Sequence, residues 1–390
     1  MTGLSGTGRS SAIRTGNRFR SRPFRSAHAV CGPTPRNPSP VRNLITLRRF
    51  GAIAAAITVA TTALAGAAAA TTPYGQPQPV PAHVFAPYFQ AYLPGDPAEF
   101  AGESGALFQN LAFLETDKPG SCQVYPNGVA TGPDYADAAD KLRARGGQLI
   151  PSFGGAYAGD NGIEIADSCA DVHAIATAYE QALVSYGATQ LDVDIEDASL
   201  TNAEGIDRRN KALLETEKWA AAQGRPLKVV YTMGTGPTAP NGDAVKMLQN
   251  AVANGTRVDT VNIMTFDYYD NKQHEMATDA KSAAAALVTT LHGLWPDKTP
   301  SQLWSMVGIT AMIGLDDYGS GGETGPVEEF TPADAVDLTV WAWQHGIALL
   351  SFWGLHRDNG SCPGQHQEAC SGVQQLPWEY STIMGTFTHR

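Results

Sequence analysis

The stretch Gln190-Leu-Asp-Val-Asp-Ile-Glu-Asp197 decides the fold, because its acidic and aliphatic side chains alternate with a period of two. Successive side chains of a β-strand point to opposite faces, so the pattern predicts a strand with Asp192, Asp194 and Glu196 on one face. Neighbours on one face lie roughly 6.5 to 7 Å apart, and desolvated carboxylates at that spacing raise the pKa of at least one of them. Tyr186-Gly187, just before the run, is typical of a helix end that leads into a buried parallel strand.

Folding alone gives no reason to gather three acids on one face, although an exposed edge strand would tolerate them in water. Asp is depleted in strands, which favours a functional role. Two roles fit the pattern. One is an acid/base device whose carboxylates have separated pKa values, and the other is an oxygen-rich site for a hard cation such as magnesium.

The charge of the chain is divided unevenly along its length. The first 70 residues contain ten arginines and no Asp or Glu, whereas the whole chain has 27 basic and 38 acidic residues. After residue 70 the balance is therefore 17 basic against 38 acidic residues, or about -21. A body this acidic argues against nucleic acid or an anionic membrane as a partner and suits a protein that acts on a neutral polymer or small molecule.

Residues 48–70 predict a secretory signal peptide, in which Arg48-Arg49 precede an Ala-rich apolar run with small residues for cleavage near its end. A single anchoring helix is the alternative, since the run is long enough to span a membrane, but its composition favours cleavage. Arg48-Arg49 is also a weak indication of twin-arginine export. Residues 1–47 are too long for the basic region of a signal, which points to a translation start near Val41. We therefore expect a secreted, extracellular protein with no membrane association after processing.

Four cysteines remain after the leader, and an even number in an exported chain predicts two disulfides. Cys362 and Cys370 bracket a short loop with Pro and Gly and form the first predicted pair, which leaves Cys122 with Cys169. Metal ligation is the weaker alternative for these cysteines, because the sequence has no C-x-x-C, H-x-H or H-E-x-x-H pattern. No metal site is predicted.

Residues 71–82 form a Pro/Gln-rich linker, after which strand-like and helix-like runs alternate. Eight strands are predicted, at 84–89, 110–115, 148–153, 190–195, 227–233, 260–266, 306–313 and 348–353. Helices with ordinary start and stop signals are predicted at 134–145, 171–186, 206–223, 243–254, 276–293 and 331–346.

Eight strand-then-helix units over about 300 residues predict an α/β fold with a single domain, a (β/α)8 TIM barrel over residues 83–390 with its site at the C-terminal ends of the strands. A doubly wound open sheet is the alternative, but no Gly-rich phosphate loop follows the first strand. In a barrel, Glu196 is the last inward residue of its strand and faces the mouth. Asp194 and Asp192 lie below it, where deeper burial favours protonation of one of them.

From about residue 84 to its end, the chain resembles the chitinases of glycoside hydrolase family 18. The fourth-strand signature D-x-x-D-x-D-x-E is present as Thr189-Gln-Leu-Asp-Val-Asp-Ile-Glu196, with Thr189 in place of the first Asp. The third-strand S-x-G-G is Ser152-Phe-Gly-Gly155, the sixth-strand M-x-Y-D is Met264-Thr-Phe-Asp267, and the eighth-strand tryptophan is Trp353. Four fragments in the right order at strand ends argue against coincidence.

The resemblance implies cleavage of β-1,4 bonds between N-acetylglucosamine units by a substrate-assisted retaining mechanism without a cofactor. Glu196 would be the general acid and later the base. Asp194 would hold the acetamide nitrogen, and Asp192 would share a proton with Asp194. Trp353 would form the floor under the distorted sugar. The remaining substrate contacts would be Asp267, Met264, Tyr88, Tyr268 and Tyr269.

Phe266 departs from the family pattern, because many relatives have a Tyr there that donates to the acetamide carbonyl. Tyr268 or Tyr269 would have to supply that hydroxyl. Thr189 matters less, since it replaces the acid farthest from the substrate.

Other functions stay open. They are a non-catalytic, lectin-like chitin-binding protein on the same barrel, an endo-β-N-acetylglucosaminidase acting on N-glycan cores, and a magnesium-dependent barrel hydrolase. Only a short loop at residues 316–330 lies between the last two strands, which predicts an open cleft and endo action. We expect a monomer whose partner is chitin or another polysaccharide that contains N-acetylglucosamine.

Overall fold

The structure is a computed structural model that describes residues 77–317 and 324–388. The predicted signal peptide and the first part of the linker lie outside the described residues. Residues 77–82 have no helix or strand, and Val80 within them is buried. Across the described ranges, no helix combines the length and the apolar character needed to cross a membrane.

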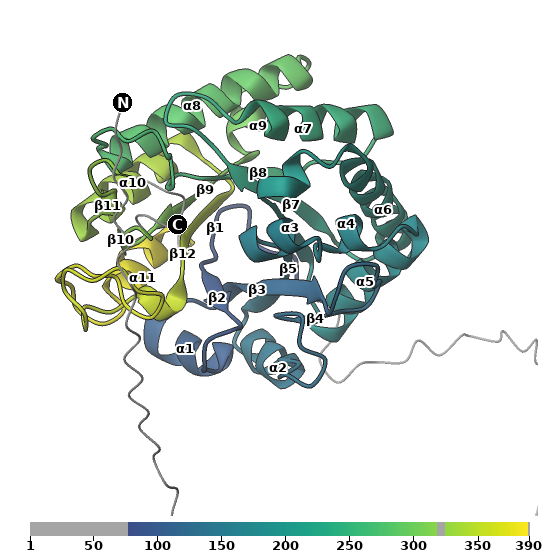
Figure 1. Cartoon of the computed structure of the whole chain (residues 1–390), viewed down its shortest axis with the longest axis horizontal. Helices are drawn as coiled ribbons and strands as arrows, with labels where there is room; N and C mark the ends of the chain where they lie inside the picture. Colours follow the sequence, from purple (N-terminus) through teal and green to yellow (C-terminus); the bar gives the residue numbers. More distant parts are fainter. Residues whose placement is uncertain (1–76, 318–323, 389–390) are drawn as a thin grey trace, which may run out of the picture. The chain divides into compact units, whose positions relative to one another are not determined.

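Eight parallel strand positions within the described residues curl into a barrel surrounded by helices (Figure 1). The first position is divided into two short strands, of which one pairs with the last strand and the other with the second, so the sheet closes on itself. In order around the barrel the strands are β1 (Val84–Phe85) with β2 (Tyr88–Gln90), β3 (Phe108–Thr116), β5 (Gln148–Gly154), β6 (Gln190–Ile195), β7 (Lys228–Gly234), β8 (Thr260–Met264), β9 (Val307–Met312) and β12 (Leu349–Trp353). The predicted (β/α)8 barrel is confirmed.

Each predicted strand is found, with ends that differ by at most two residues. The strand β6 has the predicted bounds, because its alternation of acids and aliphatics runs to both ends. The first strand is interrupted at Pro87, which has no N–H to donate to a neighbouring strand.

The helical layer contains all six predicted helices: α2 (Ala136–Ala144), α5 (Val172–Ser185), α6 (Ala203–Ala222), α7 (Gly242–Asn254), α8 (Met276–Leu294) and α10 (Pro332–His345). Sequence reasoning missed short elements, which contain too few residues for a periodic pattern. An example is α1 (Pro97–Ser104), which begins where the Asp96 side chain accepts a hydrogen bond of 2.7 Å from the Ala98 N–H. The others are α3 (Ala156–Asn161), α4 (Ile165–Ser168), α9 (Pro300–Trp304), α11 (Glu379–Met384) and β4 (Val124–Pro126).

The strand β6 shows how the fold divides apolar from polar residues. Leu191, Val193 and Ile195 are fully buried in the main hydrophobic core with residues of the surrounding helices. Asp192 and Asp194 are also buried, on the opposite face of the same strand. The helices therefore cover the apolar face, and the acids line the inside of the barrel.

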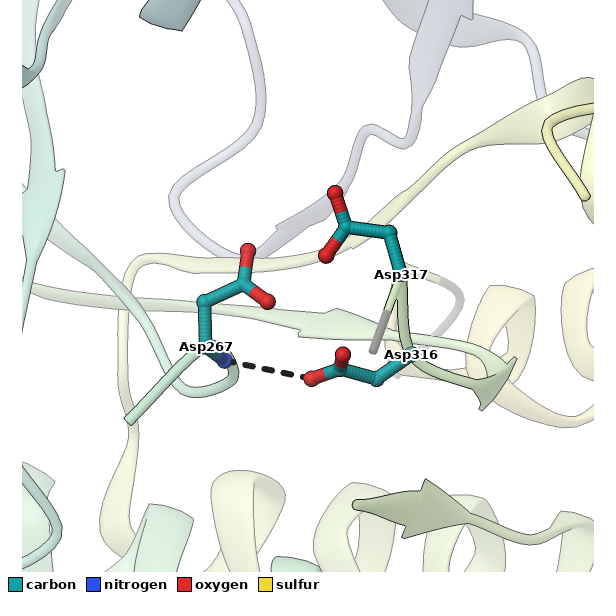
Figure 2. Close-up of side chains that lie close together, drawn as sticks. All are labelled: Asp267, Asp316 and Asp317. Carbon is teal, nitrogen blue, oxygen red and sulfur yellow. Dashed lines mark hydrogen bonds between the residues drawn. The ribbon is translucent and has the colours of Figure 1, made fainter. Parts of the chain in front are cut away.

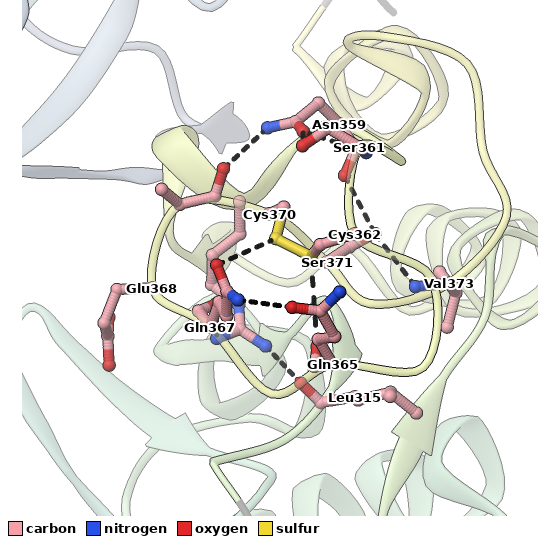
Figure 3. The surroundings of a disulfide bond; sticks show 12 residues. Leu315, Asn359, Ser361, Cys362, Gln365, Gln367, Glu368, Cys370, Ser371 and Val373 are labelled. Carbon is pink, nitrogen blue, oxygen red and sulfur yellow. Dashed lines mark hydrogen bonds between the residues drawn. A yellow bond between two sulfur atoms is a disulfide. The ribbon is translucent and has the colours of Figure 1, made fainter.

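Both predicted disulfides are present. Cys122 is bonded to Cys169, and their Cα atoms are 4.8 Å apart. Cys362 is bonded to Cys370 across a Cα separation of 6.1 Å, in the loop between β12 and α11 (Figure 3). The second disulfide brackets Glu368, which belongs to the site described below.

The chain between β9 and α10 contains a small two-stranded sheet. Here β10 (Gly314–Leu315) pairs with the antiparallel β11 (Glu329–Phe330). The predicted 316–330 loop thus ends in a strand. Because this hairpin stands beside the C-terminal ends of the barrel strands, it adds residues to the wall of the site.

Candidate active site

Asp192 is held at the centre of the barrel by side chains from three other strands. Its Oδ2 accepts hydrogen bonds from the Ser152 hydroxyl at 2.5 Å and the Tyr88 hydroxyl at 3.1 Å. Its Oδ1 accepts one from the Thr232 hydroxyl at 2.7 Å. Burial raises the pKa of Asp192 to about 6, although the three hydrogen bonds act in the opposite direction.

Asp194, one layer above, has a different environment. It is 3% exposed, and its Oδ1 has no hydrogen-bond partner among the described residues. Burial, followed by the charges of Glu196 and Asp192, raises the pKa of Asp194 well above its usual range. Because three donors stabilise the ionised form of Asp192 and burial raises the pKa of Asp194 further, Asp194 is the more readily protonated of the two.

Glu196 follows the last residue of β6 and is half-buried at the mouth of the barrel. Burial and then the charge of Asp197 raise the pKa of Glu196 to about 8, while a hydrogen bond from the Ala156 backbone lowers it. Glu196 is therefore mostly protonated at neutral pH, as a general acid must be.

The Ser-x-Gly-Gly segment lets β5 approach β6 closely. Gly154 has a φ of +115°, and a Cβ there would lie 1.9 Å from the Asp194 carbonyl oxygen. Gly155 donates its N–H to that same oxygen at 3.0 Å. Any larger residue at position 154 would push the strand that carries the acids away.

A cavity of about 660 Å³ lies over these acids. Six carboxylates line it, and no Lys, Arg or His side chain does so within the described part of the chain. Its lining residues include Glu115, Asp194, Glu196, Asp267, Asp317 and Glu368. A cavity of this size that contains acids with separated pKa values has the properties of an active site.

Trp353 forms an aromatic wall of the cavity at the end of β12. Its ring stacks on Phe113 with centroids 5.7 Å apart and planes 9° apart, and the Tyr88 ring lies 5.9 Å away. Tyr88 also lines the cavity, but its hydroxyl already bonds Asp192 and Thr232. Met264 lines the cavity too, so the structure brings all three predicted contacts together.

The segment after β8 corrects one expectation. Phe266 and Asp267 line the cavity, whereas Tyr268 and Tyr269 do not. The chain turns at Asp267, whose φ is +51°, so the Tyr268 ring packs on His274 and the Tyr269 side chain is 48% exposed. Neither tyrosine therefore places a hydroxyl in the wall of the cavity beside Phe266.

Thr189 lies away from the cavity, just before β6 begins. Its hydroxyl bonds the side-chain amide of Gln148 at 2.9 Å and accepts from the Val80 N–H. A neutral hydroxyl suits this position, because its oxygen accepts from both of these donors without adding a charge.

Sequence reasoning missed several residues of the cavity. Glu115 ends a predicted strand but carries no motif, while Tyr92, Tyr157, Asp317 and Glu368 lie in loops or short helices. Tyr92 donates its hydroxyl to Glu368 at 2.8 Å, and Tyr157 is 68% exposed beside the cavity. Only Glu115 gave a signal, since an acid at the C-terminal end of a barrel strand is positioned for function.

The chain is similar to known chitinases. It is 28% identical over 324 residues to the probable bifunctional chitinase/lysozyme of Escherichia coli K12, covering 79% of this chain and 35% of that protein. It is 27% identical over 288 residues to endochitinase 11 of Metarhizium anisopliae, and this match covers 71% of this chain and 53% of that protein. The chain thus spans about a third to a half of the curated relatives it matches.

Among solved structures, the catalytic domain of the hyperthermophilic chitinase from Pyrococcus furiosus has a TM-score of 0.68 and 28% identity. The match covers 80% of this chain and 97% of that domain. No protein-family model matches the chain.

The barrel with its acids at the C-terminal ends of the strands, together with the similarity to chitinases, supports a glycoside hydrolase. Together with the four motifs, the similarities support a relationship to the chitinases of glycoside hydrolase family 18.

Proposed function

We propose that the protein hydrolyses β-1,4 bonds between N-acetylglucosamine units of chitin by a substrate-assisted retaining mechanism. One observation carries the proposal: Glu196, Asp194 and Trp353 meet in one cavity, with Asp192 directly beneath. A similar protein supports the choice of substrate: catalytic-site mutants of the Pyrococcus furiosus domain form complexes with chito-oligosaccharides.

In the first step, the sugar lies against Trp353 and its acetamide nitrogen donates to Asp194, whose Oδ1 is available. Glu196 transfers its proton to the glycosidic oxygen, and the bond between this oxygen and the anomeric carbon breaks. The acetamide oxygen forms a new bond to the anomeric carbon, which yields a positively charged oxazolinium ring on the sugar.

In the second step, Glu196 is ionised and takes a proton from water, whose oxygen attacks the anomeric carbon from the face that the leaving group vacated. The bond to the acetamide oxygen breaks, and Glu196 regains its proton. Two displacements restore the β configuration. The shared proton of the Asp192 and Asp194 pair lets negative charge move toward Asp194 while the sugar is positive.

We further propose endo action and export from the cell. Endo action is supported by the β10–β11 hairpin, which stands where a larger insertion would close the cleft. A fall in polymer viscosity before much reducing sugar appears would support it, and release of only mono- or disaccharides without that fall would refute it. Export is supported by the two disulfides and by the Ala-rich run in residues 48–70.

Turnover and binding of chitin oligosaccharides test the proposal in the wild type, Glu196→Gln and Glu103→Gln. Glu103 is exposed on α1, so Glu103→Gln is the control that removes one carboxylate outside the cavity. We expect turnover by the wild type and Glu103→Gln, and binding without turnover by Glu196→Gln. Binding without turnover in all three would identify a lectin-like protein, and absence of both would redirect the search to N-glycan cores.

A further inference from the structure

Three aspartates converge beside the catalytic cavity, outside the line of acids on β6. Asp267 follows β8, and Asp316 and Asp317 follow β10 (Figure 2). One carboxylate oxygen from each residue lies within 4.8 Å of the other two. Oxygens that bind one calcium ion at about 2.4 Å are at most about 4.8 Å apart, so a single ion can reach all three.

A fourth carboxylate lies next to this group, beside Asp316. Glu328 is 4% exposed and lies directly before β11, where the Asp316 N–H donates to the Glu328 carbonyl at 3.1 Å. Its Oε1 accepts from the Tyr268 N–H, and its side chain interacts with Asp316. Glu328 therefore adds a carboxylate next to Asp316 from the other side of the hairpin.

Each of these four side chains has a buried oxygen without a hydrogen-bond partner among the described residues. The orphan atoms are Oδ1 of Asp267, Oδ1 of Asp316, Oδ1 of Asp317 and Oε2 of Glu328. Asp316 is only 1% exposed. A buried acceptor without a partner costs about 1 to 3 kcal/mol, and more when it is charged, so the four acids need either shared protons or a bound cation.

Nearby positive side chains do not fill this role. The Arg357 guanidinium is close enough to interact with Asp316 and Asp317, but its nitrogens donate to the backbone carbonyls of Ile313, Leu315 and Gln367. His274 faces Glu328, but its two ring nitrogens contact Asp270 and Asp279.

We propose that Asp267, Asp316, Asp317 and Glu328 bind one calcium ion in the wall of the cavity. The donors are all oxygens, which suits a hard cation, and irregular ligands from two loops suit calcium better than the strict octahedron of magnesium. Because Asp267 and Asp317 also line the cavity, the ion would fix the cavity wall in one position. This proposal goes beyond the hydrolysis proposed above and does not depend on it.

The test is calcium binding by the purified, EDTA-treated protein, measured by titration calorimetry and by thermal unfolding. We expect one calcium per chain and a rise in Tm of roughly 5 °C at a 100-fold excess over Kd, with a smaller rise for magnesium. Asp316→Asn should abolish both signals. Asp270→Asn, which removes a carboxylate that pairs with Lys272 in the same loop, should keep them.

Glu328→Gln gives a second variant if Asp316→Asn does not fold, and should weaken calcium binding at least tenfold. The proposal is refuted if the wild type shows neither a heat of binding nor a change in Tm up to about 10 mM calcium. This concentration exceeds the Kd of weak extracellular calcium sites. Proton sharing would then satisfy the four acids. Binding that survives in both variants would refute it as well.

Discussion

The Ser152 hydroxyl donates a hydrogen bond of 2.5 Å to Oδ2 of Asp192, so the third-strand and fourth-strand motifs meet inside the barrel. The strands β5 and β6 place these two residues directly opposite each other in the sheet. The bond therefore fixes Asp192, the lowest of the three acids on this face, through a residue that does not line the cavity. It also favours the ionised form of Asp192.

Ser152→Ala removes one of the three donors to Asp192 and should raise the pKa of this acid. A hydrogen bond to a charged group contributes about 1.5 to 3 kcal/mol, which corresponds to about one to two pKa units. We expect the acidic limb of the kcat/KM profile, which the Asp192 pKa of about 6 places near pH 6, to move upward, with about a tenfold loss of kcat/KM at pH 6. Ser104→Ala, which removes a buried hydroxyl on α1, is the control. An unshifted acidic limb in Ser152→Ala would contradict the assigned role.

Asp197→Asn should lower the pKa of Glu196, because the charge of Asp197 is the largest electrostatic cause that raises it to about 8. Asn tolerates the left-handed backbone at this position, where φ is +46°. Glu196 must be protonated to act as the acid, so activity is lost as the pH rises through its pKa. The basic limb of kcat/KM should therefore move to lower pH. A limb that stays in place would show that another group controls it.

Glu115→Gln should stabilise the protein at alkaline pH. Burial raises the pKa of Glu115 to about 7 from an ordinary 4.5. A raised carboxyl pKa gives stability that is complete below pH 4.5 and lost as the pH rises through 7, which amounts to about 3 kcal/mol at pH 8. Denaturant unfolding should therefore show a gain for Glu115→Gln at pH 8 relative to its effect at pH 4.5. The same change in free energy of unfolding at both pH values would rule this explanation out.

Trp353→Ala should lower kcat/KM about 100-fold, because it removes the aromatic wall that packs on Phe113 and Tyr88. Trp353→Phe should recover part of the loss, since a smaller ring can still stack. Trp343→Ala, on the outer helix α10, should behave as the wild type does. Steady-state kinetics on one oligosaccharide would decide, and a Phe variant no better than Ala would argue against stacking.

The barrel could be predicted from sequence because strand-like apolar runs alternate with helix-like amphipathic runs along the chain. In β6 the same alternation that buried Leu191, Val193 and Ile195 against the helices also aligned Asp192, Asp194 and Glu196 toward the interior. Both disulfides could be predicted from the four cysteines after the leader. Cys362 and Cys370 bracket a short loop, and pairing them leaves only Cys122 with Cys169.

The cavity wall was harder to predict, because it depends on loop conformation rather than on periodicity. The left-handed turn at Asp267 moved Tyr268 and Tyr269 away from the cavity, and a backbone angle of that kind has no marker in an Asp-Tyr-Tyr run. Asp316 and Asp317 were read as part of a loop, since only the pairing of β10 with β11 brings them toward Asp267.

The most direct test of the central claim is the anomeric form of the first product, followed by proton NMR during the first minutes of chitin oligosaccharide hydrolysis. The account predicts that the newly formed reducing end is β and changes to the equilibrium mixture only later, with no product from Glu196→Gln. A first product in the α form, or wild-type turnover by Glu196→Gln, would contradict substrate-assisted hydrolysis with Glu196 as the acid.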